Sequence, residues 1–145
     1  MTNELALDRQ VCFALYSASR ATTAAYRPML ESMGVTYPQY LVLLVLWEKD
    51  GRGVREIGAE LDLDTGTLSP LLKRLEGLGF VERRRLTTDE RRVEIHLTEA
   101  GSALRTRAVD IPKRLEGKTG MTVEDLEHLR DSLAKLTIAL HDTEG

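Results

Sequence analysis

The sequence has a single cysteine and no long apolar run, and both shortages exclude classes of protein. With only Cys12, the chain cannot form an internal disulfide or a cysteine-cluster metal site. Its longest apolar run, Leu41 to Trp47, is seven residues, well below the roughly 18 that a bilayer-spanning helix needs. The start of the chain lacks a basic-then-apolar signal pattern, so we expect a cytoplasmic protein.

The residues that are present suit one folded domain. The 145 residues are 42% hydrophobic and 30% charged, a composition typical of a globular chain with a modest core. The net charge of −3 argues at first against a polyanionic partner. The charge is unevenly placed, however, because five arginines against two acids lie between Arg83 and Arg92. Residues 119–145 carry the opposite excess, with six acids against two bases.

The spacing of apolar residues predicts a mostly α-helical chain with one β-hairpin. The expected helices run from Leu5 to Met33 with a kink near Pro28, from a Thr36 cap to a stop at Asp50-Gly51, from Val54 to a stop at 62–64, from Thr65 to Leu78, from a Thr98 cap to about Leu115, and from a Thr122 cap through Leu140. A break is expected from Gly117 to Gly120. After Gly79 the period changes, so 80–84 and 92–97 are expected to form the hairpin.

A helix pair followed by a basic hairpin predicts a winged helix-turn-helix, in which the second helix enters the DNA major groove. Its leucines at 68, 71, 72, 75 and 78 are expected to face inward. The side chains expected to contact DNA are Thr65, Thr67, Ser69, Pro70, Lys73 and Arg74 of that helix and Arg84 of the hairpin. The alternative is that these polar residues and the arginine run form only a solvated surface.

Three segments resemble the MarR-type winged-helix repressors: VREIGAEL at Val54–Leu61, LSPLLKRLEGLGFVER at Leu68–Arg83, and DERR at Asp89–Arg92 with LTEAG at Leu97–Gly101. The resemblance covers nearly the whole chain. It implies a mostly α fold with a small β-hairpin wing, organised as one domain over residues 1–145. Dimerisation helices at 1–34 and about 99–145 would flank a winged helix-turn-helix at about 36–98.

The resemblance also implies the partners. A homodimer would bind a pseudo-palindromic double-stranded DNA operator, with Asp89 holding Arg91 in place for the minor groove. A leucine seam in the last helix suits such pairing, because its members repeat in steps of three and four. The seam consists of Leu126, Leu129, Leu133, Leu136 and Leu140.

The N-terminal segments CFALY at Cys12–Tyr16, YRPML at Tyr26–Leu30 and TYPQY at Thr36–Tyr40 resemble one branch of that family, the organic-hydroperoxide-sensing repressors of the one-cysteine OhrR type. Spacing alone places Cys12 and Tyr16 on one helix face, where a hydroxyl can approach the sulfur. The resemblance supplies Tyr26 and Tyr37, from the partner subunit. The implied inducer is an organic hydroperoxide, and a low-molecular-weight thiol would trap the oxidised cysteine.

The proposed chemistry requires a thiolate, which is the nucleophile toward a peroxide oxygen. A free cysteine has a pKa of about 8.5 and is mostly protonated at neutral pH. Phenol donors and a nearby helix N-terminus would favour the anion without a metal.

Two other functions stay open on the residues alone. The protein could be a repressor released by a small phenolic or aromatic ligand, with Cys12 serving only as core packing. It could also be a thiol peroxidase, although such an enzyme needs no winged helix, and we therefore expect no enzyme activity. We expect no metal and no cofactor, because the three histidines are scattered and no glycine-rich phosphate loop occurs.

Overall fold

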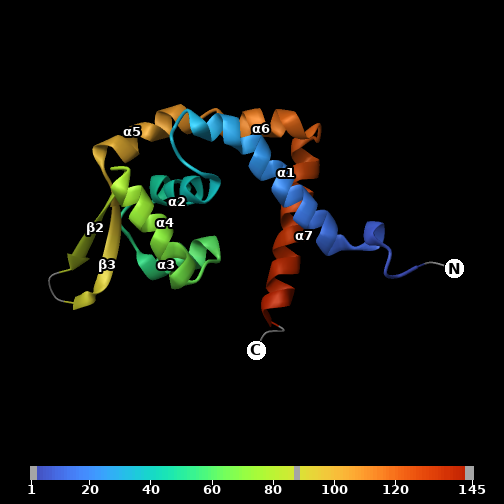
Figure 1. Ribbon diagram of the computed structural model, residues 1–145, viewed down its shortest axis with the longest axis horizontal. Helices are drawn as coiled ribbons and strands as arrows, with labels where there is room; N and C mark the ends of the chain where they lie inside the picture. Colours follow the sequence, from blue (N-terminus) through green and yellow to red (C-terminus); the bar gives the residue numbers. More distant parts are fainter. Residues whose placement is uncertain (1–2, 87–88, 143–145) are drawn as a thin grey trace. The chain divides into compact units, whose positions relative to one another are not determined.

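The computed structural model describes residues 3–86 and 89–142, except for the side chains of 89–91. The chain forms two compact units, Met1–Val109 and Asp110–Gly145 (Figure 1). The first unit contains the 3₁₀ turn η1 (Leu7–Arg9), α1 (Val11–Glu31), α2 (Tyr37–Glu48), β1 (Arg52–Gly53), α3 (Val54–Leu61), α4 (Thr65–Gly77), β2 (Val81–Leu86), β3 (Asp89–Leu97) and α5 (Glu99–Ala108). The second contains α6 (Ile111–Thr119) and α7 (Val123–Asp142). The fold is therefore mostly helical with a small β wing, as predicted.

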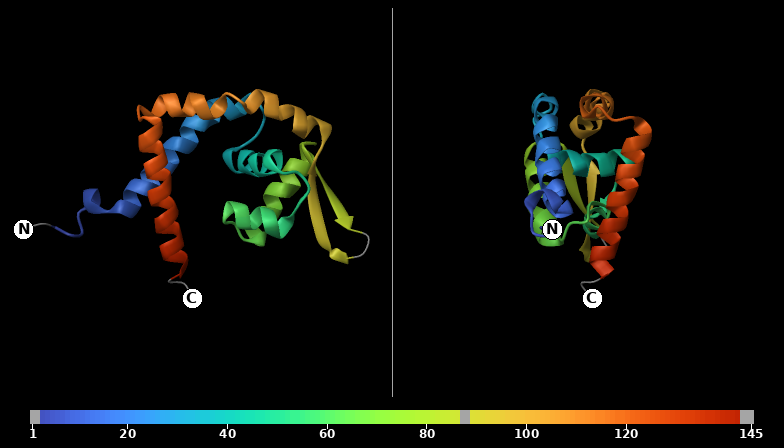
Figure 2. Two further views of the ribbon diagram at one scale, coloured as in Figure 1. Left: turned by 180° about the vertical axis from the view of Figure 1, so that it is seen from behind. Right: turned by 90° about the vertical axis from the view of Figure 1, so that its right-hand side faces the viewer.

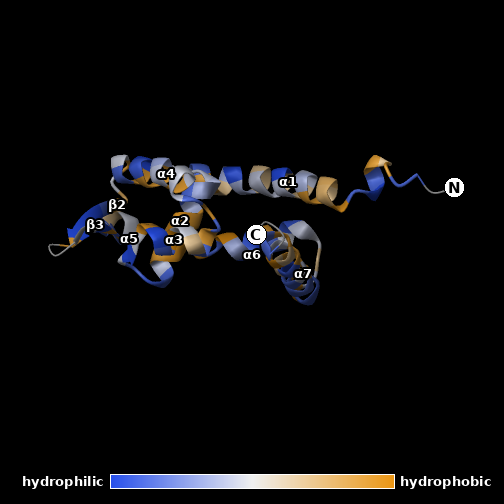
Figure 3. Cartoon of the chain, turned by 90° about the horizontal axis from the view of Figure 1, so that it is seen from below, coloured by the Kyte–Doolittle hydropathy of each residue, from blue (hydrophilic) through white to orange (hydrophobic). Residues whose placement is uncertain are grey.

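Helix α2 lies at the centre of the first unit, where it contacts α1, α3, α4 and α5. The helix starts with a capping box: the Thr36 amide donates to Gln39 Oε1 at 3.0 Å, and the Gln39 amide donates to Thr36 Oγ1 at 3.4 Å. Its apolar sequence is largely orange in Figure 3, and Val42 and Leu43 are fully buried. Since burying one such side chain stabilises a fold by about 1.5–3 kcal/mol, α2 is the main apolar anchor of this unit.

The turn between α3 and α4 completes a helix-turn-helix. Helix α3 ends at Leu61, and Asp62 takes a left-handed conformation with φ 57°. The Leu63 amide donates to the Gly58 carbonyl at 2.9 Å. A Cβ on Gly58 would lie 2.8 Å from the Leu63 carbonyl oxygen, so only glycine lets the chain fold back this closely.

Three of the five leucines expected to face inward are buried, and Leu71 is half-buried. Leu68, Leu72 and Leu75 are at most 1% exposed. Leu78 was expected to face inward, but it is 48% exposed. The helix ends one residue earlier, at Gly77, and the chain turns at Gly79, whose φ is 83°, so Leu78 lies just past the end of α4.

The wing is a three-stranded antiparallel sheet in the order β1-β3-β2. The hairpin pairs Val81 with Leu97 and Arg83 with Ile95, and Figure 2 shows it extending away from the helices of the first unit. This confirms the predicted hairpin. Strand β1 was not predicted, because two residues are too few to show alternation, yet Arg52 pairs with Ile95 on the other edge of β3.

Helix α1 starts later than predicted. The expected start was Leu5, but Gln10 is extended, with φ −90° and ψ 110°, and α1 begins at Val11. The Gln10 side-chain amide donates to the carbonyls of Glu4 at 2.9 Å and Ala6 at 3.0 Å. These bonds hold the preceding residues in a loop and η1, although their apolar spacing fits a helix. Cys12 therefore lies in the first turn of α1.

The predicted helix from Thr98 to about Leu115 is also wrong, because it is divided into α5 and α6. Pro112 lies in the first turn of α6. Proline has no amide hydrogen, and its ring clashes with the carbonyl four residues earlier, so α5 cannot continue through it. The break expected from Gly117 is shorter than predicted, since Gly117 lies inside α6 and the helix ends at Gly120, with φ 68°.

The second unit buries little of its apolar surface. The Asp125 amide donates to Thr122 Oγ1 at 3.0 Å, which confirms the predicted cap of α7. Helix α7 has no buried residue, and Leu129 and Leu140 of the seam are 45% and 53% exposed. Of the other seam leucines, Leu126, Leu133 and Leu136 are half-buried.

Candidate cysteine site and candidate DNA interface

Cys12 is exposed and not disulfide-bonded, and it is the second residue of α1. The first amide groups of a helix have no partner within the helix, and the positive end of the helix dipole lies there. Both effects favour a negative charge at this end of α1. Tyr16 lies one turn further along and is 60% exposed, with the Arg20 guanidinium 5.6 Å from its ring centroid.

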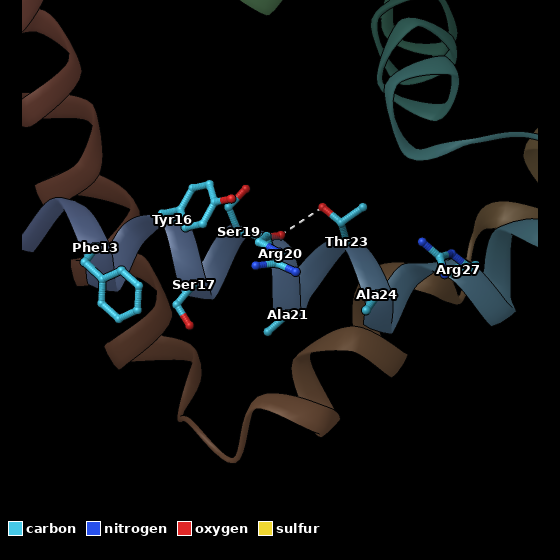
Figure 4. Close-up of a pocket in the computed structure, with 9 residues that line it drawn as sticks. All are labelled: Phe13, Tyr16, Ser17, Ser19, Arg20, Ala21, Thr23, Ala24 and Arg27. Carbon is cyan, nitrogen blue, oxygen red and sulfur yellow. Dashed lines mark hydrogen bonds between the residues drawn. The ribbon is translucent and has the colours of Figure 1, made fainter. Parts of the chain in front are cut away.

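A hollow of about 580 Å³ follows Cys12 along α1, and every residue that lines it comes from this helix (Figure 4). The lining residues are Phe13, Tyr16, Ser17, Ser19, Arg20, Ala21, Thr23, Ala24 and Arg27. The Thr23 hydroxyl donates to the Ser19 carbonyl at 2.8 Å, so it is engaged by its own helix. The face of α1 beside Cys12 therefore combines aromatic rings, hydroxyls and guanidinium groups, without an acid.

Three tyrosines pack together where α1 meets α2; we call Tyr26, Tyr37 and Tyr40 the tyrosine cluster. The ring centroids of Tyr26 and Tyr37 are 4.7 Å apart, and those of Tyr26 and Tyr40 are 5.8 Å apart. Burial, reinforced by the two neighbouring phenols, raises the pKa of Tyr26 to about 12. Burial also raises the pKa of Tyr37 and of Tyr40. All three phenols keep their protons at neutral pH and can donate hydrogen bonds.

Cys12 and the tyrosine cluster lie far apart within one chain. Cys12 and Tyr26 are both in α1 and are separated by fourteen positions. At about 1.5 Å of rise per residue, this spacing amounts to about 21 Å. The structure therefore brings Tyr26 and Tyr37 together but does not place Cys12 beside them in the same subunit. That the partner supplies these two tyrosines stays a prediction.

Helix α4 presents the polar face that the sequence predicts. Of the six expected residues, Thr65, Thr67, Pro70, Lys73 and Arg74 are exposed and Ser69 is half-buried. The helix begins at Asp64, whose Oδ1 accepts from the Thr67 amide at 2.7 Å. This hydrogen bond is the largest contribution to the lowered pKa of Asp64. The Asp64 carboxyl group is therefore ionised at neutral pH. The start of α4, with its exposed threonines, is fixed by this cap.

The arginines of the wing are partly paired with acids. Arg84 donates from Nε and Nη2 to Glu82 Oε1, at 2.9 and 2.6 Å. Arg83 Nε lies 3.7 Å from Glu76 Oε1 of α4. Exposed pairs of this kind contribute only about 0–1 kcal/mol, so a phosphate can compete for Arg84. The predicted Asp89–Arg91 contact involves side chains outside those that the structure describes.

Sequence reasoning missed Arg52, a guanidinium that is only 7% exposed. Its Nε donates to the Lys49 carbonyl at 3.1 Å, and its side chain lies 3.6 Å from Glu56 and 3.4 Å from Glu60. Since Arg52 belongs to β1, these contacts join the wing sheet to α3. One arginine between two glycines has no spacing pattern that predicts burial.

Other kinds of site receive no support from the residues described. In residues 3–86 and 89–142, no three His, Cys, Asp or Glu side chains are grouped so that they could hold a metal ion. Over the same ranges, no helix combines the length and apolar composition that a membrane crossing requires.

Comparison with known proteins places this architecture in a class. The family of transcriptional regulators described as SarA/Rot matches residues 24–107. The HTH-type transcriptional regulator TtmR of Methylorubrum extorquens is 50% identical over 139 residues, which cover 96% of this chain and 71% of that protein. The chain belongs to the SarA/Rot and MarR-type winged-helix transcriptional regulators.

A second group of similarities concerns redox regulation. The organic hydroperoxide resistance transcriptional regulator of Bacillus subtilis is 45% identical over 139 residues, covering 96% of this chain and 95% of that protein, which supports the organic-hydroperoxide-sensing branch. AbfR of Staphylococcus epidermidis, solved in its reduced form bound to DNA, has 34% identity and a TM-score of 0.78 over 92% of this chain and 94% of its own. AbfR has also been solved overoxidised on DNA and with a disulfide formed.

Proposed function

We propose that this protein is a homodimeric repressor that binds a pseudo-palindromic DNA operator and is released when an organic hydroperoxide oxidises Cys12. The observation that carries the proposal is an exposed, single cysteine in the first turn of α1, in a chain 45% identical to an organic hydroperoxide regulator. A free thiol and a DNA target suit the cytoplasm. The chain acts as a regulator and not as an enzyme.

The first chemical step oxidises sulfur and reduces the peroxide. The Cys12 thiolate attacks one peroxide oxygen, an S–O bond forms, and the O–O bond breaks. The products are a sulfenic acid on Cys12 and an alkoxide, which takes a proton from water and leaves as the alcohol. Tyr16, with Tyr26 and Tyr37 of the other protomer, would donate hydrogen bonds to the thiolate and lose them after oxidation.

The second step depends on the absence of another cysteine. No internal disulfide can form, because the chain has one cysteine. A low-molecular-weight thiol would therefore attack the sulfenic sulfur, forming a mixed disulfide and releasing water. Without that thiol, more peroxide would produce the irreversible sulfinic acid. Since AbfR has been solved overoxidised on DNA, we expect the mixed disulfide to be the form that leaves the operator.

The proposed DNA contacts follow from exposure and charge. Thr65, Thr67, Ser69, Pro70, Lys73 and Arg74 of α4 would face the major groove, and Arg84, Asp89 and Arg91 of the wing would face the backbone and minor groove. A dimer would then place two copies of α4 about one helical turn, roughly 10 base pairs, apart.

One experiment tests the proposal directly. Wild-type protein and Cys12→Ser are treated with cumene hydroperoxide, with and without glutathione, and each sample is divided between intact-mass analysis and a DNA-binding assay. We expect a glutathione adduct and loss of DNA binding only for the wild type with both reagents, reversed by dithiothreitol. Release of Cys12→Ser by peroxide would contradict the proposal. Tyr26→Phe and Tyr37→Phe should still bind DNA but react more slowly with peroxide.

A ligand-released repressor is the second candidate, because Tyr37 also lines a hollow of about 340 Å³ at the junction of α1 and α2. Its lining residues are Thr23, Arg27, Leu30, Glu31, Val35, Thr36, Tyr37 and Pro38. In that case a phenolic compound would release DNA equally well from wild-type protein and from Cys12→Ser. A thiol peroxidase would instead show catalytic peroxide turnover that Cys12→Ser loses.

A further inference from the structure

One side chain of α2 connects the helical core to the base of the wing. Trp47 donates from Nε1 to the Gly101 carbonyl at 3.0 Å. Gly101 lies in the first turn of α5, four residues after β3 ends. A Cβ on Gly101 would overlap the Phe80 carbonyl oxygen, so the start of α5 and the residue before β2 touch without free space. A displacement of Trp47 therefore either breaks this hydrogen bond or moves the base of the wing.

A second contact connects Trp47 to the tyrosine cluster. The Tyr40 ring is 6.3 Å from the Trp47 ring between centroids, in an edge-on arrangement of 69°. The Tyr40 ring centroid also lies 5.8 Å from that of Tyr26 and 6.3 Å from that of Tyr37. Tyr40 is only 2% exposed, so it has no open solvent into which it could move. The contacts form a continuous series from Tyr26 and Tyr37 to Gly101.

We propose that Tyr40 and Trp47 are positioning residues that transmit the state of Tyr26 and Tyr37 to the base of the wing through the Trp47–Gly101 hydrogen bond. This inference rests on the proposed function, in which Tyr26 and Tyr37 lose a thiolate partner when Cys12 is modified. Packed aromatic rings in a core cannot shift independently, because interiors contain few voids. A change at Tyr26 is thus passed to Tyr40, then to Trp47, and then to α5 and β2.

Sequence spacing indicates only one step of this series, the pair Tyr40 and Trp47. Tyr40 and Trp47 are seven positions apart on α2 and therefore share one helix face. Spacing could not predict the hydrogen bond from Trp47 to the Gly101 carbonyl, because the two residues are 54 positions apart.

The first test uses intrinsic fluorescence, because Trp47 is the only tryptophan in the chain. We expect the Trp47 emission maximum or lifetime to change when wild-type protein forms the Cys12–glutathione mixed disulfide, with no change for Cys12→Ser under the same treatment. Tyr26→Ala should change the emission without any oxidation. Tyr40→Leu, which removes the intermediate ring, should uncouple Trp47 emission from the Cys12 modification. Unchanged Trp47 emission both in the adduct and in Tyr26→Ala would overturn the inference.

The second test measures coupling to DNA, on a labelled duplex selected from a random pool by the reduced protein. The ratio of the Kd of the mixed disulfide to the Kd of the reduced protein measures the coupling, and couplings of this kind are commonly about 5- to 150-fold. Trp47→Phe keeps an apolar ring and removes the donor, so we expect a ratio near 1 with thiol reactivity unchanged. The matched control is Leu41→Ala, a half-buried side chain of α2 that does not share the helix face of Tyr40 and Trp47, which should keep the wild-type ratio.

The outcomes separate this inference from the proposed function. If the adduct forms and releases DNA from wild type and from Trp47→Phe to the same extent, the function stands and the role of Trp47 is wrong. If no adduct forms, the redox function fails, and the link between the tyrosine cluster and Trp47 is then decided by the Tyr26→Ala emission alone.

Discussion

The winged-helix part and the second unit of this protein have similar leucine patterns but bury them very differently. Between α2 and β3, residues such as Leu43, Ile57 and Leu72 are at most 1% exposed. In α7, no residue is buried, and Ile138 is 63% exposed. The winged helix thus completes a core from its own chain, whereas α7 has no fully buried side chain.

The difference indicates which part folds on its own contacts and which part depends on assembly. An exposed apolar stripe on a helix is stable in water only when it pairs with another surface. A second copy offers the same stripe, and a two-fold dimer brings two reading helices to one duplex.

The largest effect is expected from a charge in the α7 seam. Leu133→Asp should convert the dimer into a monomer and weaken operator binding by about 10²- to 10⁴-fold, because one half-site contact is lost. Sedimentation velocity and DNA titration measure the two effects. Ser132→Asp adds the same charge beside the seam and should leave both unchanged. A Leu133→Asp dimer with full affinity would show that α7 is not the assembly surface.

The second largest effect is expected from truncating a buried side chain of α2. This variant tests whether the winged-helix part is stabilised by its own core. Leu43→Ala removes a fully buried side chain and should lower the free energy of unfolding by about 2–5 kcal/mol in urea denaturation. Its neighbour Leu44 is 39% exposed, and Leu44→Ala should cost less than about 1 kcal/mol. Equal losses for the two variants would mean that α2 is not packed as described.

A smaller effect is expected at the wing, which projects from the well-packed part. Arg91→Ala should weaken operator binding and lower the slope of log Kd against log salt by about 0.9, since one phosphate contact is lost. Asp89→Ala should weaken binding less, by freeing Arg91. Arg105→Ala on α5 removes the same charge and should change neither quantity. A salt series that leaves the Arg91→Ala slope at the wild-type value would exclude this contact.

The smallest effect concerns the tyrosine cluster at high pH. The pKa of Tyr26 is raised from its ordinary value near 10 to about 12, so the folded state holds this proton more tightly than the unfolded state. The resulting stability is fully present below about pH 10 and is lost as the pH rises through about 12. Absorbance at 295 nm should show a phenol ionising near pH 12, and this step should be missing in Tyr26→Phe. A Tyr26→Phe titration identical to that of the wild type would contradict the assignment.

Local sequence features predicted the elements that depend on neighbours along the chain. The Thr36, Thr98 and Thr122 caps each accept the amide hydrogen bond that their sequence predicts. The polar face of α4 and the hairpin were found in the same way, because helical and strand periods are set by short-range geometry. Two of the wrong predictions, the early start of α1 and the undivided helix over α5 and α6, also have local causes. The first is due to the Gln10 hydrogen bonds before α1 and the second to Pro112 in α6, and neither is visible in the apolar pattern.

Residue types and short spacings were enough to predict the mostly helical winged fold, the single cysteine and the polar face of α4. These properties follow from residue type and from spacings of a few residues. The burial of Arg52, the contacts that join Tyr26 to Trp47 through Tyr40, and the hydrogen bond from Trp47 to Gly101 became known only from the folded structure. Such contacts join residues far apart in the chain, and their partners are selected by packing and by the need to satisfy buried polar groups, which no local pattern encodes.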